Sequence, residues 1–181
     1  MKIEFTIDKR DFLIYQLYTA SKSGKIRKIR SRLTYLISFI YICLGVLFLA
    51  KNDPKISIVF FSISILWYLL IPIYIRKRIL HNYSKYIDAH YANRYGKKAT
   101  FIFEEEYIES KSIMGETKFK ISDIISLDET GDYCYIRFSS GVSIIIPKRK
   151  IENFSALREK LDQIIAKLKI TPAFDINWTW K

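Results

Sequence analysis

Cysteine and histidine are scarce in this sequence, which has two residues of each. Cys43 lies in an apolar run and Cys134 in an apparent strand, so we expect no disulfide between them. The few cysteines and histidines do not have the spacing of metal ligands, so we predict no metal site. The opening residues, MKIEFTID, lack the features of a signal peptide, and we expect nothing to be removed.

Sequence motifs for catalysis are missing as well. The chain has no Gly-rich phosphate loop, no metalloprotease helix motif and no nucleophile elbow. Two acidic groups are predicted to be solvated turns: Glu104–Glu106, and the corner formed by Asp128, Glu129 and Asp132. Because catalysis needs an acid, a base and a stabilising group placed together, we predict that the protein is not an enzyme and uses no cofactor.

Charge is missing from two long segments, Leu33–Ala50 and Ile56–Ile75. At about 1.5 Å per residue, either segment is long enough to span roughly 30 Å of hydrocarbon. Both are apolar on all sides, whereas a helix of a soluble core keeps a polar stripe. Residues 51–55, KNDPK, provide turn residues between them. We therefore predict a transmembrane helical hairpin.

Basic residues border the two apolar segments. The net charge is +12, and residues 1–98 hold 18 of the 30 basic residues but 5 of the 18 acidic ones. Because positive charge favours the cytoplasmic side, we predict that both termini lie inside. Eight cations are predicted to contact anionic lipids of the inner leaflet: Lys25, Arg27, Lys28, Arg30, Arg32, Arg76, Lys77 and Arg78. Since residues 99–181 are nearly neutral, we expect no binding to nucleic acid.

Small residues recur with a spacing of seven in both segments, at Ser38 and Gly45 and at Ser57 and Ser64. This spacing places them on one face of each helix, where small side chains allow close approach in lipid. We predict that these four residues form the inner seam of the hairpin. Neither segment carries an ionisable acid or base of the kind that marks a transport pathway, and two helices are too few to enclose a pore.

The remaining sequence indicates an α+β protein. Residues 2–8 alternate as a strand does, and Asp8 is expected to cap a helix from Lys9 to about Ser23. Residues 76–98 predict a linking helix that ends near Gly96.

From Ala99 onward, six short β-rich runs predict an antiparallel meander or small barrel, with one turn at Met114-Gly115. A helix from Phe154 to about Lys169 should cover this β region. Because a core of about 75 residues is marginal by itself, we expect the N-terminal strand to join the sheet.

The sequence thus divides into five predicted parts: an N-terminal strand and amphipathic helix with a basic juxtamembrane segment (1–32), the transmembrane hairpin (33–75), the basic linking helix (76–98), a cytoplasmic β domain with its C-terminal helix (99–170) and an aromatic tail (171–181). In the tail, Trp178 and Trp180 fall on one side of an extended chain, and we expect them to pack on the β domain. Interfacial anchoring or a partner contact is the alternative.

The element SGVSIIIPKR, at 140–149, with the preceding KISDIISLDETGDYCYI, resembles the YcxB-like family. This family comprises small bacterial two-span membrane proteins whose C-terminal region looks like a pleckstrin-homology-like domain. The order of strand, helix, two spans, linking helix and β region resembles the family as well. The resemblance implies no catalytic residue.

Lys148 and Arg149 allow two interpretations. They mark the turn between a buried strand, ended by Pro147, and the last helix; alternatively, they contact a ligand phosphate.

For the whole protein, we expect a membrane-anchored binding or scaffold module at the bacterial inner membrane, which docks a protein partner of unknown identity or the inner leaflet and can form oligomers. The alternative is an accessory subunit of a membrane transport or secretion assembly.

Overall fold

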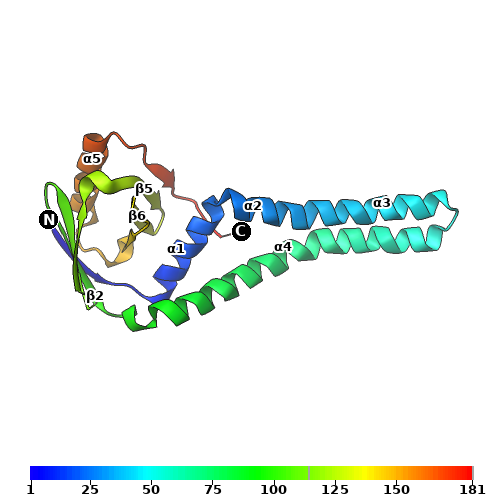
Figure 1. Ribbon diagram of the computed structural model, residues 1–181, viewed down its shortest axis with the longest axis horizontal. Helices are drawn as coiled ribbons and strands as arrows, with labels where there is room; N and C mark the ends of the chain where they lie inside the picture. The colour runs from blue at the N-terminus through cyan, green and yellow to red at the C-terminus, as the bar shows by residue number, and fades with distance from the viewer. Residues whose placement is uncertain (114, 181) are drawn as a thin grey trace. The chain divides into compact units, whose positions relative to one another are not determined.

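The computed structural model describes residues 1–113 and 115–180, so Met114 of one predicted turn and Lys181 at the end of the tail lie outside the described residues. The chain forms two compact units. The first, which we call the β unit, combines Met1–Tyr15 with Ile87–Thr179, and the second, the hairpin unit, contains Gln16–Tyr86 and Trp180. Figure 1 shows the elements of both units.

Two four-stranded sheets make up most of the β unit. Sheet A is an antiparallel meander of β1 (Lys2–Thr6), β2 (Lys98–Phe103), β3 (Tyr107–Ser112) and β4 (Gly115–Lys120). Sheet B contains the antiparallel strands β5 (Ile124–Thr130), β6 (Tyr133–Phe138) and β7 (Ser143–Pro147), and β8 (Ala173–Asp175) pairs with β5 in parallel. The meander therefore forms two sheets rather than one closed barrel.

The six predicted strands between residues 99 and 147 are confirmed, as is the addition of the N-terminal strand to the sheet. In β1, Ile3 lies opposite Phe101 of β2 and Phe5 lies opposite Ala99. The strand β8 was not predicted, and it accounts for part of the predicted tail. Its three residues are too few to produce a recognisable alternation.

Alternate residues of both sheets point into one hydrophobic core, which includes Phe101, Ile108, Ile136 and Ile146. The helix α5 (Phe154–Leu168) completes this core with Leu157, Leu161 and Ile164, as its apolar stripe predicted. The helix begins where the Asn153 side chain accepts a hydrogen bond from the backbone N–H of Ala156, at 3.0 Å.

The hairpin unit consists mainly of two long apolar helices. The first contains α2 (Gly24–Ser31), the π-helical turn η1 (Arg32–Leu36) and α3 (Ile37–Ala50), and the second is α4 (Pro54–Tyr91), whose last residues belong to the β unit. Both are long and apolar enough to span a membrane, and 17% and 11% of the residues in their most apolar windows are buried.

The turn between the two helices uses the predicted residues in a different arrangement. Asn52 adopts a left-handed conformation with φ of 59°. The Asp53 side chain accepts a hydrogen bond from the Ile56 N–H, at 3.3 Å, and so caps α4. Pro54 is the first residue of α4. It therefore begins the second helix, where its missing N–H is no loss, rather than ending the first.

Candidate functional site

The short helical turn η4 (Lys148–Lys150) follows β7 and places three cations against carboxylates of the β unit. Lys148 donates to a Glu129 carboxylate oxygen at 2.7 Å and to the Thr130 carbonyl at 2.6 Å. Glu129 is buried and also contacts Arg158 of α5. Lys148 therefore ties the end of β7 to β5 within the same sheet.

Asp11, in the helix α1 (Lys9–Lys22), is the centre of a second group of charges. Its side chain is 0% exposed. One carboxylate oxygen accepts from the Arg149 guanidinium at 2.5 Å and from the Tyr133 hydroxyl at 2.9 Å. The other accepts from the Lys150 ammonium at 3.0 Å and from the Asp8 backbone N–H at 2.9 Å. We call Asp8, Asp11, Tyr133, Arg149 and Lys150 the Asp11 cluster.

The hydrogen bonds of the Asp11 cluster determine its protonation. Burial by itself would raise the pKa of Asp11, but the hydrogen bonds from the Asp8 backbone, Lys150 and Tyr133 outweigh burial and lower the pKa. Burial also raises the pKa of Tyr133, to about 12. The neighbouring Asp11 carboxylate raises this pKa as well, whereas Arg149 lowers it. Near neutral pH Asp11 is therefore a carboxylate and Tyr133 a protonated phenol.

The helix α1 begins at Lys9, as predicted, but its cap differs from the prediction. The predicted cap, Asp8, has its carboxylate held by Lys150 at 2.6 Å, while its backbone carbonyl accepts the first hydrogen bonds of the helix. Asp11, three residues later, accepts from the Asp8 N–H, which is the reciprocal bond of a capping box. Sequence reasoning missed Asp11, although the Asp-x-x-Asp spacing at a helix start was a signal for it.

These contacts bear on the two interpretations of Lys148 and Arg149. Both cations already pair with buried carboxylates, Lys148 with Glu129 and Arg149 with Asp11. The geometry therefore favours the turn interpretation.

The expectation that Asp128 and Glu129 are solvated is wrong. Both side chains are buried. Ion pairs compensate the cost of burying their charges: Asp128 pairs with Arg137 at 2.8 Å, and Glu129 pairs with Lys148 and Arg158. Asp132, the third residue of that corner, is exposed.

The predicted seam residues of the hairpin are brought together. The Ser57 hydroxyl donates to the Gly45 carbonyl at 2.8 Å, and the Ser64 hydroxyl donates to the Ser38 carbonyl at 2.9 Å. All four residues are buried, and a Cβ added to Gly45 would lie 2.7 Å from the Phe61 ring. The four predicted seam residues therefore face inward, between the two helices.

The predicted membrane-surface cations lie on α2, on η1 and in the middle of α4. All of them are exposed except Arg30, which is half-buried with its guanidinium 5.4 Å from the centre of the Trp180 ring. This contact was not predicted, since Trp180 was expected to pack on the β domain.

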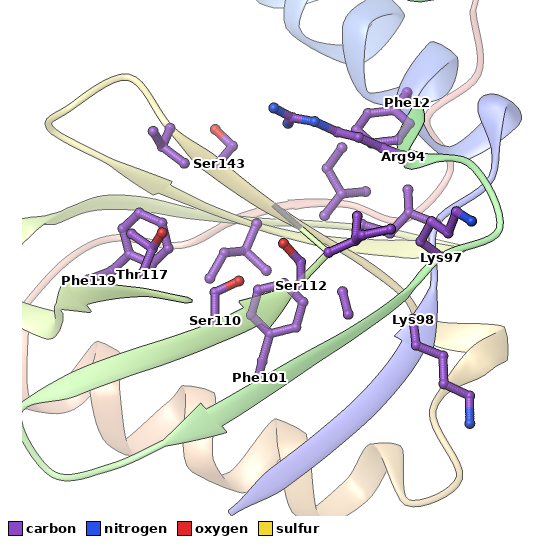
Figure 2. A pocket seen from close by; sticks show the side chains of 16 residues that line it. Phe12, Arg94, Lys97, Lys98, Phe101, Ser110, Ser112, Thr117, Phe119 and Ser143 are labelled. Carbon is purple, nitrogen blue, oxygen red and sulfur yellow. The ribbon is translucent and has the colours of Figure 1, made fainter. Parts of the chain in front are cut away.

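A cavity of about 250 Å³ lies within the β unit, and sequence reasoning did not predict it. Its lining comes from β2, β3, β4 and β7, from Phe12 of α1 and from the segment that joins α4 to β2. Figure 2 shows Phe12, Arg94 and Lys97 at one end and Thr117 and Phe119 toward the other. The cavity combines an apolar lining with a cationic end.

Comparison with known proteins gives one family. A family model described as YcxB-like protein matches residues 103–161. This confirms the predicted resemblance for the segment from the end of β2 into α5, which includes Glu129 and Tyr133 and excludes Asp11. Searches of curated proteins and of solved structures found no significant match.

Proposed function

We propose that this chain, which is YcxB-like over residues 103–161, is a membrane-anchored binding or scaffold module without enzymatic activity. In this proposal the hairpin crosses the bacterial inner membrane twice with both termini inside. A pleckstrin-homology-like domain on the cytoplasmic face docks a protein partner or the inner leaflet.

The observation that carries the proposal is the surface of the hairpin unit. Large apolar side chains point outward along both helices, such as Phe39, Ile58 and Ile65, which are 63%, 63% and 62% exposed. Exposed apolar surface of this extent is rare on soluble monomers, whereas hydrocarbon would cover it without cost. The exposed cations on α2 and α4 lie where they would border such a membrane, and they support the inside orientation.

The element order of the β unit supports the pleckstrin-homology-like part of the proposal. A four-stranded antiparallel meander is followed by a three-stranded meander and a helix that completes the core. The strand β8 is an addition to this order.

The chemistry of the buried groups supports a binding role rather than catalysis. Cys134 is buried, and burial raises the pKa of its thiol to about 11, so it stays protonated near neutral pH. The carboxylates of Asp11 and Glu129 are held by cations of the fold. These groups stabilise the β unit, and their contacts leave them poorly placed for a substrate.

Cysteine accessibility in intact cells tests the topology. Asn52→Cys and Ser139→Cys would be made separately in a background with Cys43→Ala and Cys134→Ala, and both positions are exposed. We expect a membrane-impermeant maleimide to label position 52 and to label position 139 only after lysis. Labelling of position 139 in intact cells would overturn the cytoplasmic placement of the β unit.

Capture of a partner tests the docking role. The full-length tagged protein would be cross-linked in cells, purified in mild detergent and compared with a hairpin-only control. Repeated absence of a specific partner, together with no binding of the β unit to anionic vesicles, would contradict the proposal.

The second candidate is an accessory subunit of a membrane assembly. An apolar groove on the outside of the hairpin, lined by Tyr35, Leu36, Phe39 and Tyr68, favours it, because another helix could pack there. The seam residues give it no support, since they are buried between α3 and α4. This candidate predicts that Phe39→Ala reduces co-purification with a larger complex, and unchanged assembly would count against it.

A further inference from the structure

The cavity in the β unit exists because the sheet face that lines it carries small side chains. On β3 the core residue Ile108 is followed, at the same face of the strand, by Ser110 and Ser112. Ser110 lies directly opposite Thr117 of β4. Large residues at these positions would extend the core into the space, so their absence leaves about 250 Å³ open.

Apolar groups dominate the rest of the lining. Phe101, Phe119 and Ile144 contribute from three strands, and Ile113 and Val142 are exposed apolar residues at its margin. A methylene group needs about the volume of one water molecule, roughly 30 Å³, so the cavity has room for about eight carbons of a chain.

Arg94, Lys97 and Lys98 all line the cavity, and Figure 2 shows Arg94 and Lys97 at the end that holds Phe12. Arg94 ends the short turn η2 (Ala92–Arg94), and Lys97 directly precedes β2. Gly96, with φ of 66°, donates its N–H to the Ile7 carbonyl at 3.2 Å and so holds this segment beside β1. Among the residues that the structure describes, Arg94 contacts the Tyr91 ring, and no carboxylate pairs with Arg94 or Lys97.

Arg94 and Lys97 differ from the three cations of η4. Lys148, Arg149 and Lys150 are paired with buried acids, whereas Arg94 and Lys97 keep their charge available at the end of an apolar space. An unpaired cation beside an apolar cavity favours a ligand with an anionic group and an apolar body.

We propose that this cavity binds one acyl chain that carries a carboxylate or phosphate head group. The chain lies against Phe101, Phe119 and Ile144, and the head group lies beside Arg94 and Lys97. The inference goes beyond the proposed scaffold role and does not depend on the side of the membrane on which the β unit lies, so the topology experiment and the binding experiment can fail separately.

Photolabelling tests the site directly. The full chain, reconstituted in phosphatidylcholine nanodiscs, would be irradiated with a diazirine derivative of decanoic acid, and the labelled peptides would be located by mass spectrometry. We expect label on the peptides that contain Ile113, Phe119 and Val142. Excess decanoate or decyl phosphate should suppress the label, and decyltrimethylammonium should not.

Two sets of variants define the expected effects. Ser110→Leu with Thr117→Leu fills the cavity and should reduce labelling at least tenfold, whereas Lys118→Leu adds a leucine to the opposite face of β4 and should leave it unchanged. Arg94→Gln with Lys97→Gln should weaken binding roughly fivefold. Lys118→Gln with Lys120→Gln removes two charges as well, from exposed side chains of β4 that do not line the cavity, and serves as its control.

The outcomes separate the possibilities. Suppression by decanoate alone assigns a free fatty acid, and suppression by decyl phosphate alone assigns a phospholipid-type head group. Label confined to α3 and α4, equal labelling of the filled variant and its control, or equal competition by the cationic amphiphile would overturn the proposal. If thermal unfolding shows that the filled variant is not folded, the charge variants test the proposal instead: equal binding by Arg94→Gln with Lys97→Gln and by its control would overturn it.

Discussion

The two units of this chain place polar and apolar groups in opposite ways. In the hairpin unit, serine hydroxyls and a glycine lie inside, and bulky apolar side chains point outward. In the β unit, apolar side chains form the core, and the buried carboxylates are paired with cations, as Asp11 is with Arg149 and Lys150.

Each arrangement lowers the free energy of folding in a different solvent. In water the dominant gain is burial of apolar surface, so the β unit places Ile136 and Leu161 inside and satisfies each buried carboxylate with cations. In hydrocarbon, apolar burial gives no gain, and close packing with hydrogen bonds between helices remains. The contrast within one chain supports different surroundings for the two units.

The largest effect is expected from Asp11→Ala. This change leaves Arg149, Lys150 and the Tyr133 hydroxyl without their shared acceptor. We expect a loss of about 3 kcal/mol in the free energy of unfolding of the β unit, near the lower end for a broken buried pair, because Arg149 is 42% exposed. Urea titration of the full chain in mild detergent, followed by near-ultraviolet circular dichroism of the tyrosines, measures it.

Asp8→Ala is the matched control, since Asp8 shares Lys150 with Asp11 but its side chain is 52% exposed. A pair exposed to this extent should contribute about 0.5 kcal/mol. Equal losses for the two variants would show that burial at Asp11 does not matter, and the contrast between buried pairs and exposed pairs in the β unit would be lost.

Gly45→Leu tests the hairpin side of the comparison. A side chain at Gly45 would meet the Phe61 ring and displace the Ser57 hydrogen bond, so we expect the hairpin to lose about 2 kcal/mol. Transfer from mild detergent to SDS, followed by Trp67 fluorescence in a Trp178→Phe, Trp180→Phe background, measures it. Val46→Leu, at an exposed position, should have almost no effect; a larger effect there than at Gly45 would reverse the assignment of inner and outer faces.

Acid should weaken the β unit through the same carboxylate. The pKa of Asp11 is lower in the folded protein than its ordinary value of 3.8, so the folded state binds fewer protons than the unfolded state in this range. The stabilisation is complete above pH 3.8 and is lost as the pH falls through the lower, folded value. The loss should be smaller than that of Asp11→Ala, because a protonated carboxyl keeps its volume. A pH series of urea titrations should show a slope below pH 4 that Asp11→Asn removes; an unchanged slope in Asp11→Asn would assign it to other carboxylates.

Much of the fold could be predicted because local patterns determine it. Strand alternation identified β2 to β7, and the two uncharged segments identified the apolar helices. The addition of β1 to sheet A followed from a physical argument, the small size of the β region by itself. The strand β8 has no local pattern that identifies it. It forms because residues 173–175 pair with β5 at the edge of sheet B.

The buried ion pairs could not be predicted, because the partners in each pair are distant in the sequence. Asp11 and Arg149 are separated by 138 positions, and Glu129 is separated from Lys148 by 19 and from Arg158 by 29. Neighbouring acidic residues in a sequence are expected to be solvated when no nearby cation can pair with them. Asp128 and Glu129 were therefore assigned to the surface, although the fold brings Arg137, Lys148 and Arg158 to them. The cavity was missed for a related reason, since small residues on two strands reveal a space only when the strands are paired and the facing sheet is in place.

The smallest effect is expected from Ser64→Ala, which removes the hydroxyl that joins α4 to the Ser38 carbonyl. Hydrogen bonds between helices in lipid contribute about 0.6 kcal/mol on average, because the separated helices also find partners. Ser62→Ala is the matched control, since the Ser62 hydroxyl is exposed and donates to Ile58 of its own helix. The same SDS titration should show a small loss for Ser64→Ala and none for Ser62→Ala. Equal values would mean that the inward serines contribute through their size alone, and the comparison with the β unit would then rest on packing rather than on polar pairing.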